Sequence, residues 1–143
     1  MKAFTFGLEK VLDLRKFNED EAKIELGRAM GVLADLESKL FVLARERVRA
    51  AAAQFAPGND AAMIQQYMFY ITRLDNIKEQ LLQEIALAEL KVEEAREAFL
   101  EASKERKVLD KLREKQQKEY RKVILTEETK TLDDIGPASF LDN

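Results

Sequence analysis

Among the adjacent acidic residues of this chain, two pairs are considered as candidates for acid–base or metal chemistry. They are Glu93-Glu94 and Asp133-Asp134. Neighbouring carboxylates can share a proton or bind a divalent cation, but only where further polar groups converge on them. The chain has no histidine and no cysteine, so imidazole and thiolate groups are absent. We therefore interpret both pairs as solvated charge and expect no enzyme, no metal site and no cofactor.

The strongest electrostatic feature is a basic segment at residues 101–125, which has nine basic and five acidic side chains. Its basic residues are Lys104, Arg106, Lys107, Lys111, Arg113, Lys115, Lys118, Arg121 and Lys122. Such a segment is either a solvated helix face with local ion pairs or a surface for an acidic partner. The formal net charge is −3, and Tyr120 is the one aromatic residue in the segment. We therefore expect no nucleic-acid partner.

A run of large apolar residues, 67–71 (YMFYI), forms the second candidate surface. Consecutive residues of a helix point around its whole circumference, so one packing seam cannot bury all five. Tyr67 and Tyr70 fit the seam, which leaves Met68, Phe69 and Ile71 partly exposed. We interpret this surplus as a binding site or as a self-association surface.

The elements that position these residues are two long helices. Steps of four and three from Leu8 predict a coiled-coil seam in which ten of fourteen positions are apolar. The fourteen positions are Leu8, Leu12, Arg15, Glu19, Ala22, Leu26, Ala29, Leu33, Leu36, Leu40, Leu43, Arg47, Ala50 and Gln54. The polar exceptions predict a seam that is looser at both ends.

A second seam follows a turn that the sequence marks with Pro57 and Gly58. It consists of Met63, Tyr67, Tyr70, Leu74, Ile77, Leu81, Ile85, Ala88, Val92, Ala95, Phe99 and Ala102, with Leu109 and Leu112 further on. A short turn forces the two helices antiparallel, with Leu43 opposite Leu74 and Ala29 opposite Ala88.

The predicted fold is therefore all-α, a single antiparallel two-helix coiled-coil hairpin with a longer C-terminal helix. We place the first helix at about 5–55, the turn at 56–60, the second helix at about 60–130 and a flexible tail at 131–143. The tail is predicted from its threonines and from the Gly136-Pro137 pair. Glu9 and Lys10 interrupt the apolar start of the chain. We therefore expect no signal peptide and a cytoplasmic protein.

Short motifs in a particular order resemble those of a known family. They are 4–15 (FTFGLEKVLDLR), Leu26-Gly27, 65–67 (QQY), Leu74-Asp75, 105–112 (ERKVLDKL) with Lys115 and Tyr120, and 130–135 (KTLDDI). Each motif alone is a common coiled-coil pattern, so the resemblance rests on their order and spacing. In these respects the chain resembles the flagellar type III export protein family FliJ.

The resemblance implies a soluble part of the bacterial flagellar export apparatus, at the cytoplasmic face of the inner membrane. Its partners would be the hexameric export ATPase (FliI-like), the export gate protein (FlhA-like) and export chaperones, which the family escorts. The protein would act as a stalk that enters the ATPase ring and promotes its assembly. By position, the gate contacts would be Leu43, Tyr70 and Leu74, and Glu46 stands near a place where the family sometimes has an aromatic residue.

For the ATPase we expect contacts from basic residues at the end where the longer helix projects past the shorter one. The candidates are Arg106, Lys107, Lys111, Arg113 and Lys115. Two alternatives remain open, an injectisome-type secretion stalk and a coiled-coil adaptor or holdase chaperone with no ATPase partner. We expect no small-molecule substrate. The free protein is either a monomeric hairpin or a bundle of two.

Overall fold

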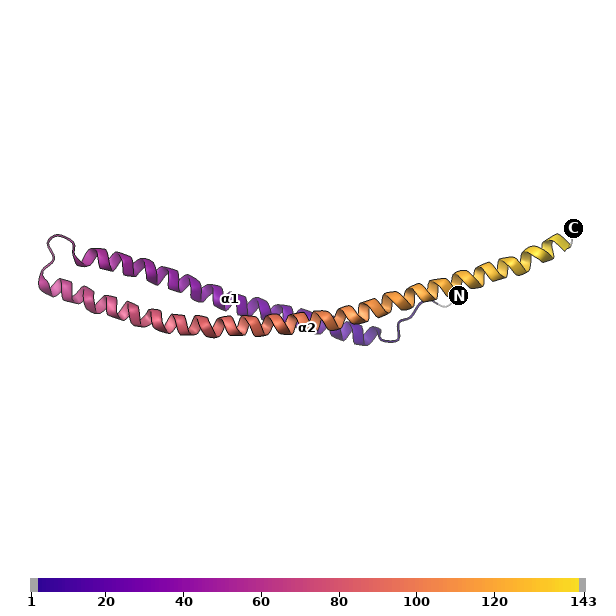
Figure 1. The fold of residues 1–143 in the computed structure, drawn as a ribbon, viewed down its shortest axis with the longest axis horizontal. Helices are drawn as coiled ribbons and strands as arrows, with labels where there is room; N and C mark the ends of the chain where they lie inside the picture. The colour runs from indigo at the N-terminus through magenta and orange to yellow at the C-terminus, as the bar shows by residue number, and fades with distance from the viewer. Residues whose placement is uncertain (1–2, 142–143) are drawn as a thin grey trace. The chain divides into compact units, whose positions relative to one another are not determined.

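The computed structural model describes residues 3–141, and the side chains of residues 3–135. The described chain forms two helices, α1 (Glu9–Gln54) and α2 (Ala61–Leu141), and contains no strand. α1 has 46 residues and α2 has 81, and the two pack against each other (Figure 1). The predicted class, an all-α two-helix coiled-coil hairpin with a longer second helix, is confirmed. Over the described residues, neither helix is long and apolar enough to cross a membrane.

The turn between the helices is closed by side chains that satisfy the exposed backbone groups of both helix ends. The side-chain amide of Asn59 donates to the carbonyl oxygens of Ala53 (2.8 Å) and Gln54 (3.1 Å) at the end of α1. Gly58 has a φ of 92°, a conformation that glycine adopts without steric cost. A carboxylate oxygen of Asp60 accepts from the amide of Met63 at 2.9 Å, which caps the start of α2.

The chain divides into two compact units, and each is described separately. The turn unit comprises Glu21–Phe99. In it, the α1 seam positions from Ala22 to Leu43 are all half-buried, as the heptad pattern predicts. The buried apolar side chains of this unit belong mainly to α2 and are Ala50, Leu74, Leu81, Ile85, Ala88 and Val92. This single seam is the hydrophobic core of the turn unit.

The terminal unit comprises Met1–Asp20 and Leu100–Asn143. Its buried apolar residues are Phe6 and Leu12, and Leu12 has no exposed surface. α1 starts at Glu9 and not near residue 5, with the amide of Glu9 donating to the carbonyl of Phe6 at 3.1 Å. The segment before Glu9 is non-helical and buries Phe6, so tertiary packing outweighs the local helix propensity there.

The end of α2 differs from the predicted end near residue 130, because the helix continues to Leu141. The threonines that we interpreted as signs of fraying fit the helix. The hydroxyls of Thr126 and Thr131 each donate to the carbonyl four residues earlier, at 2.8 Å. From Leu125 to Ile135 the side chains are exposed. The predicted flexibility of residues 131–143 stays a prediction, and residues 142–143 lie outside the described chain.

Candidate functional site

Ion pairs occupy most of the polar positions of the seam. In the terminal unit Arg15 pairs with Glu105, and Arg113 donates to Glu9 at 3.0 Å. In the turn unit, Arg47 donates to Asp75 at 2.6 Å. The sequence pattern treated these polar positions as weak points of the coiled coil. The structure shows that they are the places where α1 and α2 exchange charge-assisted hydrogen bonds.

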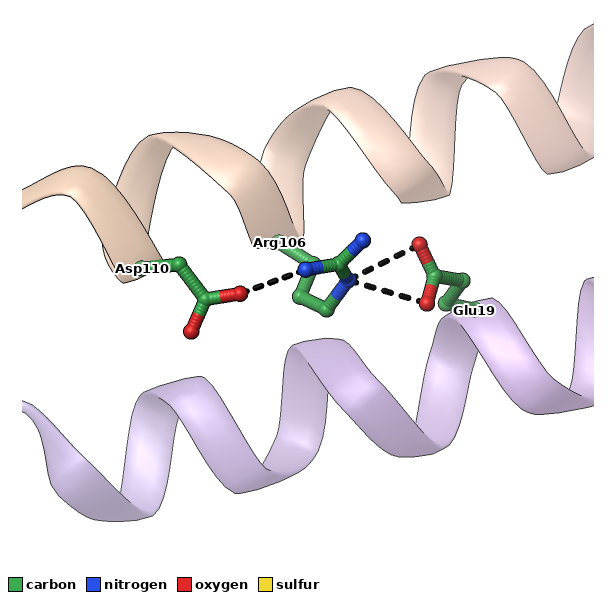
Figure 2. Close-up of polar contacts among 3 residues, drawn as sticks. All are labelled: Glu19, Arg106 and Asp110. Carbon is green, nitrogen blue, oxygen red and sulfur yellow. Dashed lines mark hydrogen bonds and ion pairs between the residues drawn. The ribbon is translucent and has the colours of Figure 1, made fainter.

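Arg106 is the centre of the most enclosed of these pairs (Figure 2). Its Nε donates to both carboxylate oxygens of Glu19 at 2.9 Å, and its Nη1 donates to Asp110. The side chains of Arg106 and Glu19 are only 24% and 17% exposed. The hydrogen bond from Arg106 holds the pKa of Glu19 below its ordinary value, against the opposing effect of desolvation. The guanidinium of Arg106 therefore has its hydrogen-bond partners within the hairpin.

Arg113 is also occupied within the terminal unit. In addition to its bond with Glu9, its guanidinium lies 6.0 Å from the ring centre of Phe4. The Phe4 ring in turn packs against Tyr120, with ring centres 5.6 Å apart. This N-terminal aromatic contact was not predicted, because a short non-helical segment gives no periodic signal.

The lysines of the basic segment lie on a different face from these arginines. We call the following residues the lysine ridge: Lys104, Lys107, Lys111, Lys115, Lys118 and Lys122. All six are exposed, and their spacing of three or four residues places them on one face of α2. Within the described residues, none of the six forms an ion pair, whereas Arg106 and Arg113 both do. Two exposed apolar side chains, Leu100 and Val108, line a groove on this face together with Lys104, Lys107 and Lys111.

In the turn unit, one side of the seam is hollowed into a shallow groove that includes two of the three predicted gate residues. We call it the Leu43 groove, and its lining is Ser38, Lys39, Val42, Leu43, Glu46, Leu74, Ile77 and Leu81. Leu74 is buried and Leu43 is half-buried, so these two form the floor. Val42 is 62% exposed at the rim. The third predicted residue, Tyr70, is half-buried and touches the rim residue Glu46.

Glu46 provides a fixed negative charge beside the Leu43 groove. Arg49 donates to its two carboxylate oxygens at 2.6 and 2.9 Å, and the Tyr70 hydroxyl donates at 2.7 Å. These bonds, that of Arg49 first, lower the pKa of Glu46 to about 2. The Glu46 carboxylate in turn raises the pKa of Tyr70. At neutral pH the rim therefore presents an ionised carboxylate and a neutral phenol.

Comparison with models of known protein families shows the family of this chain. The family model described as Flagellar FliJ protein matches residues 4–143, which is nearly the whole sequence. The chain belongs to the FliJ family. The resemblance inferred from the motifs is thereby confirmed, and it identifies a stalk-type protein associated with the type III flagellar export apparatus.

A solved structure supports the fold of this FliJ family member. It is titled "Structure of a putative YscO homolog CT670 from Chlamydia trachomatis" and has a TM-score of 0.64. The match covers 94% of this chain and 93% of that chain at 20% sequence identity, so the likeness concerns the fold alone. No curated protein sequence matches the chain.

Proposed function

We propose that this FliJ family member is a stalk that enters the ring of the hexameric export ATPase and promotes its assembly, with the lysine ridge as the contact surface. The observation that supports this proposal is the contrast between the six exposed lysines of the basic segment and the two paired arginines Arg106 and Arg113. The arginines Arg106 and Arg113 neutralise acids of α1, whereas the six lysines are exposed and have no ion-pair partner among the described residues. Their charge is therefore available to an acidic partner.

The physical properties of the ridge suit a contact that forms and breaks repeatedly. Exposed ion pairs contribute only about 0.2 to 1 kcal/mol each, and salt screens them. A row of six such pairs would bind a stalk in an acidic pore without fixing it in one position. The lysine side chains are also flexible, so they can follow a partner surface that changes during ATP hydrolysis. This reasoning replaces Arg106 and Arg113 in the predicted ATPase site with the neighbouring lysines.

Charge reversal on the ridge tests this proposal. The triple variant Lys107→Glu, Lys111→Glu and Lys115→Glu is expected to abolish most of the stimulation of ATPase hexamer formation, because it converts attraction into repulsion. The stimulation by the wild-type protein is expected to decline as the salt concentration rises. The measurement is ATPase activity together with the fraction of hexamer in sedimentation.

The matched control reverses three exposed lysines of α1, Lys10→Glu, Lys16→Glu and Lys23→Glu. It makes the same change in net charge away from the ridge, and it is expected to stimulate the ATPase nearly as well as the wild type. Equal loss in both triple variants would show an effect of net charge alone, and full stimulation by the ridge variant would exclude the ridge as the contact.

We further propose that the Leu43 groove contacts the export gate protein. The groove combines an apolar floor of Leu43 and Leu74 with a charged rim of Lys39 and Glu46. Apolar surface with a polar border is the usual composition of a binding patch. The family's escort of empty export chaperones belongs to the same proposal, without assigned residues.

The gate contact is best tested at Val42, because replacing Leu43 or Leu74 would also weaken the seam. Val42→Glu is expected to lower the affinity for the cytoplasmic part of the gate protein at least about tenfold, because a carboxylate would have to be buried at the rim. Val48→Glu is the control, since Val48 is similarly exposed but does not line the groove. Calorimetry or fluorescence anisotropy would measure both affinities. Unchanged affinity in a folded Val42→Glu protein would count against the groove.

A further inference from the structure

The turn unit has a second apolar stripe on α1, and its three large side chains are mostly exposed. We call the following residues the Phe41 stripe: Phe41, Ala44, Val48, Ala51 and Phe55. They follow the same alternation of three and four residues as the seam itself, so they form a continuous line along the helix. Phe41, Val48 and Phe55 are 64%, 71% and 75% exposed. Three large side chains at seven-residue intervals are the pattern of a coiled-coil seam without its partner.

The Phe41 stripe lies on the opposite side of the hairpin seam from the Leu43 groove. Phe41, Val48 and Phe55 each follow a seam position of α1 by one residue, whereas the groove residues Val42 and Glu46 each precede one, so the two sets lie on opposite sides of the seam. On α2, Asp75 follows the seam position Leu74 by one residue and bonds to Arg47. On α2, Met68 lies seven residues before Asp75, therefore on the same ridge, and it is 56% exposed. The Glu46–Tyr70 hydrogen bond lies on the groove side. The unit thus has two separate apolar faces, and the gate proposal uses only one of them.

The large residues of the stripe are symmetric about Val48, which favours a second copy of this chain as its occupant. Phe41 and Phe55 are each seven residues from Val48, and Ala44 and Ala52 are each four residues from it. If two stripes pack antiparallel about a twofold axis at Val48, valine meets valine and phenylalanine meets phenylalanine. Ala44 meets Ala52, which lies beside the stripe. Small residues opposite each other allow close approach of the helices, and aromatic pairs stack favourably. A twofold interface requires this kind of self-complementary surface.

The charges near the stripe are compatible with the same arrangement. Three arginines lie near its centre. The guanidinium of Arg45 lies 5.9 Å from the ring centre of Phe41, whereas Arg47 donates to Asp75 and Arg49 donates to Glu46. Antiparallel pairing about Val48 brings Arg45 next to the alanines at 51 and 52 of the second copy, and Arg47 next to Arg49. The ion pairs with Asp75 and Glu46 offset the charges of Arg47 and Arg49 within each copy. Parallel stripes would place Arg45 of one copy beside Arg45 of the other, and these like charges would repel each other.

We propose that the Phe41 stripe is a self-association surface on which a second copy of the chain packs antiparallel about a twofold axis at Val48. Phe41, Val48, Phe55 and Met68 together expose roughly 500 Å² per copy, given the size of such side chains. Two copies would bury at most about 1,000 Å² in total, which is the lower limit for a specific interface. The dimer is therefore weak and dissociates on dilution, which leaves the single hairpin that a stalk requires.

Sedimentation equilibrium over a range of protein concentrations tests the association. The wild type is expected to pass from monomer to dimer as the concentration rises, and Val48→Glu is expected to raise the dissociation constant at least about tenfold. Val42→Glu is the matched control, because it places the same charge at a similarly exposed valine on the groove side. It is expected to leave the dissociation constant unchanged.

Disulfide cross-linking tests the geometry, and the absence of native cysteine makes its result unambiguous. Val48→Cys is expected to form a cross-linked dimer under mild oxidation, whereas Val42→Cys is not. A mixture of Phe41→Cys and Phe55→Cys chains is expected to give mainly the mixed disulfide, since antiparallel pairing brings these two positions together.

A monomer at every concentration would overturn the proposal, as would a dimer equally stable in Val48→Glu. Preferential formation of Phe41→Cys homodimers would overturn the antiparallel arrangement. These outcomes are independent of the proposed export role. Gate binding is tested with Val42→Glu, and ATPase stimulation is tested with the charge-reversal variant of the lysine ridge. If the stripe instead binds a helix of another protein, this chain alone would be monomeric in sedimentation equilibrium. That result would also reject self-association.

Discussion

Leu12→Ala is expected to lower the free energy of unfolding by about 2–5 kcal/mol, the range for removing a buried leucine side chain. Leu12 is the largest fully buried side chain in the described part of the chain, with no exposed surface. Among the side chains that the structure describes in the terminal unit, only Leu12 and Phe6 are buried apolar residues. Because a two-helix hairpin has a single seam, no second layer of the core can compensate for the cavity.

The measurement is urea denaturation followed by circular dichroism, with Leu14→Ala as the control. Leu14 lies two residues away on the same helix and is 56% exposed, so its truncation tests composition and helix propensity without opening a cavity. We expect Leu14→Ala to change the stability by less than about 0.5 kcal/mol. Similar losses in the two variants would show that Leu12 is not packed as the structure has it.

The heptad pattern was sufficient to predict the seam because the spacing of apolar residues directly determines which face of a helix is covered. The α1 positions from Ala22 to Leu43 are all half-buried, as their steps of three and four predict. The heptad pattern did not predict the contacts that the polar seam positions make. Glu19 was scored as a break in the seam, because its partner, Arg106, is 87 residues away and no local pattern connects them. The predicted looseness at the seam ends stays a prediction, and the structure adds that ion pairs between α1 and α2 occupy these positions.

The basic segment shows why a candidate site is harder to predict than a fold. Composition revealed nine basic residues, but not which of them face α1. A signal was present, since continuing the second seam from Ala102 in steps of four and three reaches Arg106, Leu109 and Arg113. Following that seam further would have assigned both arginines to the interior of the hairpin and left the lysines exposed. The contact of Phe4 with Tyr120 had no such signal, because a non-helical segment can approach α2 at many positions.

Glu19→Gln is expected to destabilise the terminal unit by about 1 kcal/mol at neutral pH, the scale of a charge-assisted hydrogen bond that is partly screened by solvent. The change keeps the size of the side chain but removes the negative charge that accepts both bonds from Arg106. Glu25→Gln is the matched control. Glu25 pairs only with Arg28 on the same helix, and that pair is mostly exposed, so its loss is expected to have little effect.

The pH dependence of this difference identifies its cause. The Arg106 hydrogen bond holds the pKa of Glu19 below its ordinary value of 4.5. A carboxylate whose pKa is lower in the folded protein stabilises the fold fully above its unfolded pKa and loses that contribution as the pH falls through its folded pKa. The stability difference between wild type and Glu19→Gln should therefore be constant from neutral pH down to about 5 and should vanish in stronger acid.

Denaturation curves for wild type, Glu19→Gln and Glu25→Gln over this pH range would separate the electrostatic contribution from a packing effect. A packing defect caused by the amide would persist unchanged in acid, because burial of carbon atoms does not depend on protonation of the carboxylate. A difference that stays constant at every pH would contradict an ionised Glu19 bound to Arg106. Equal stability of the wild type and Glu19→Gln in acid would instead establish that a charged pair holds α1 against α2 beside the lysine ridge.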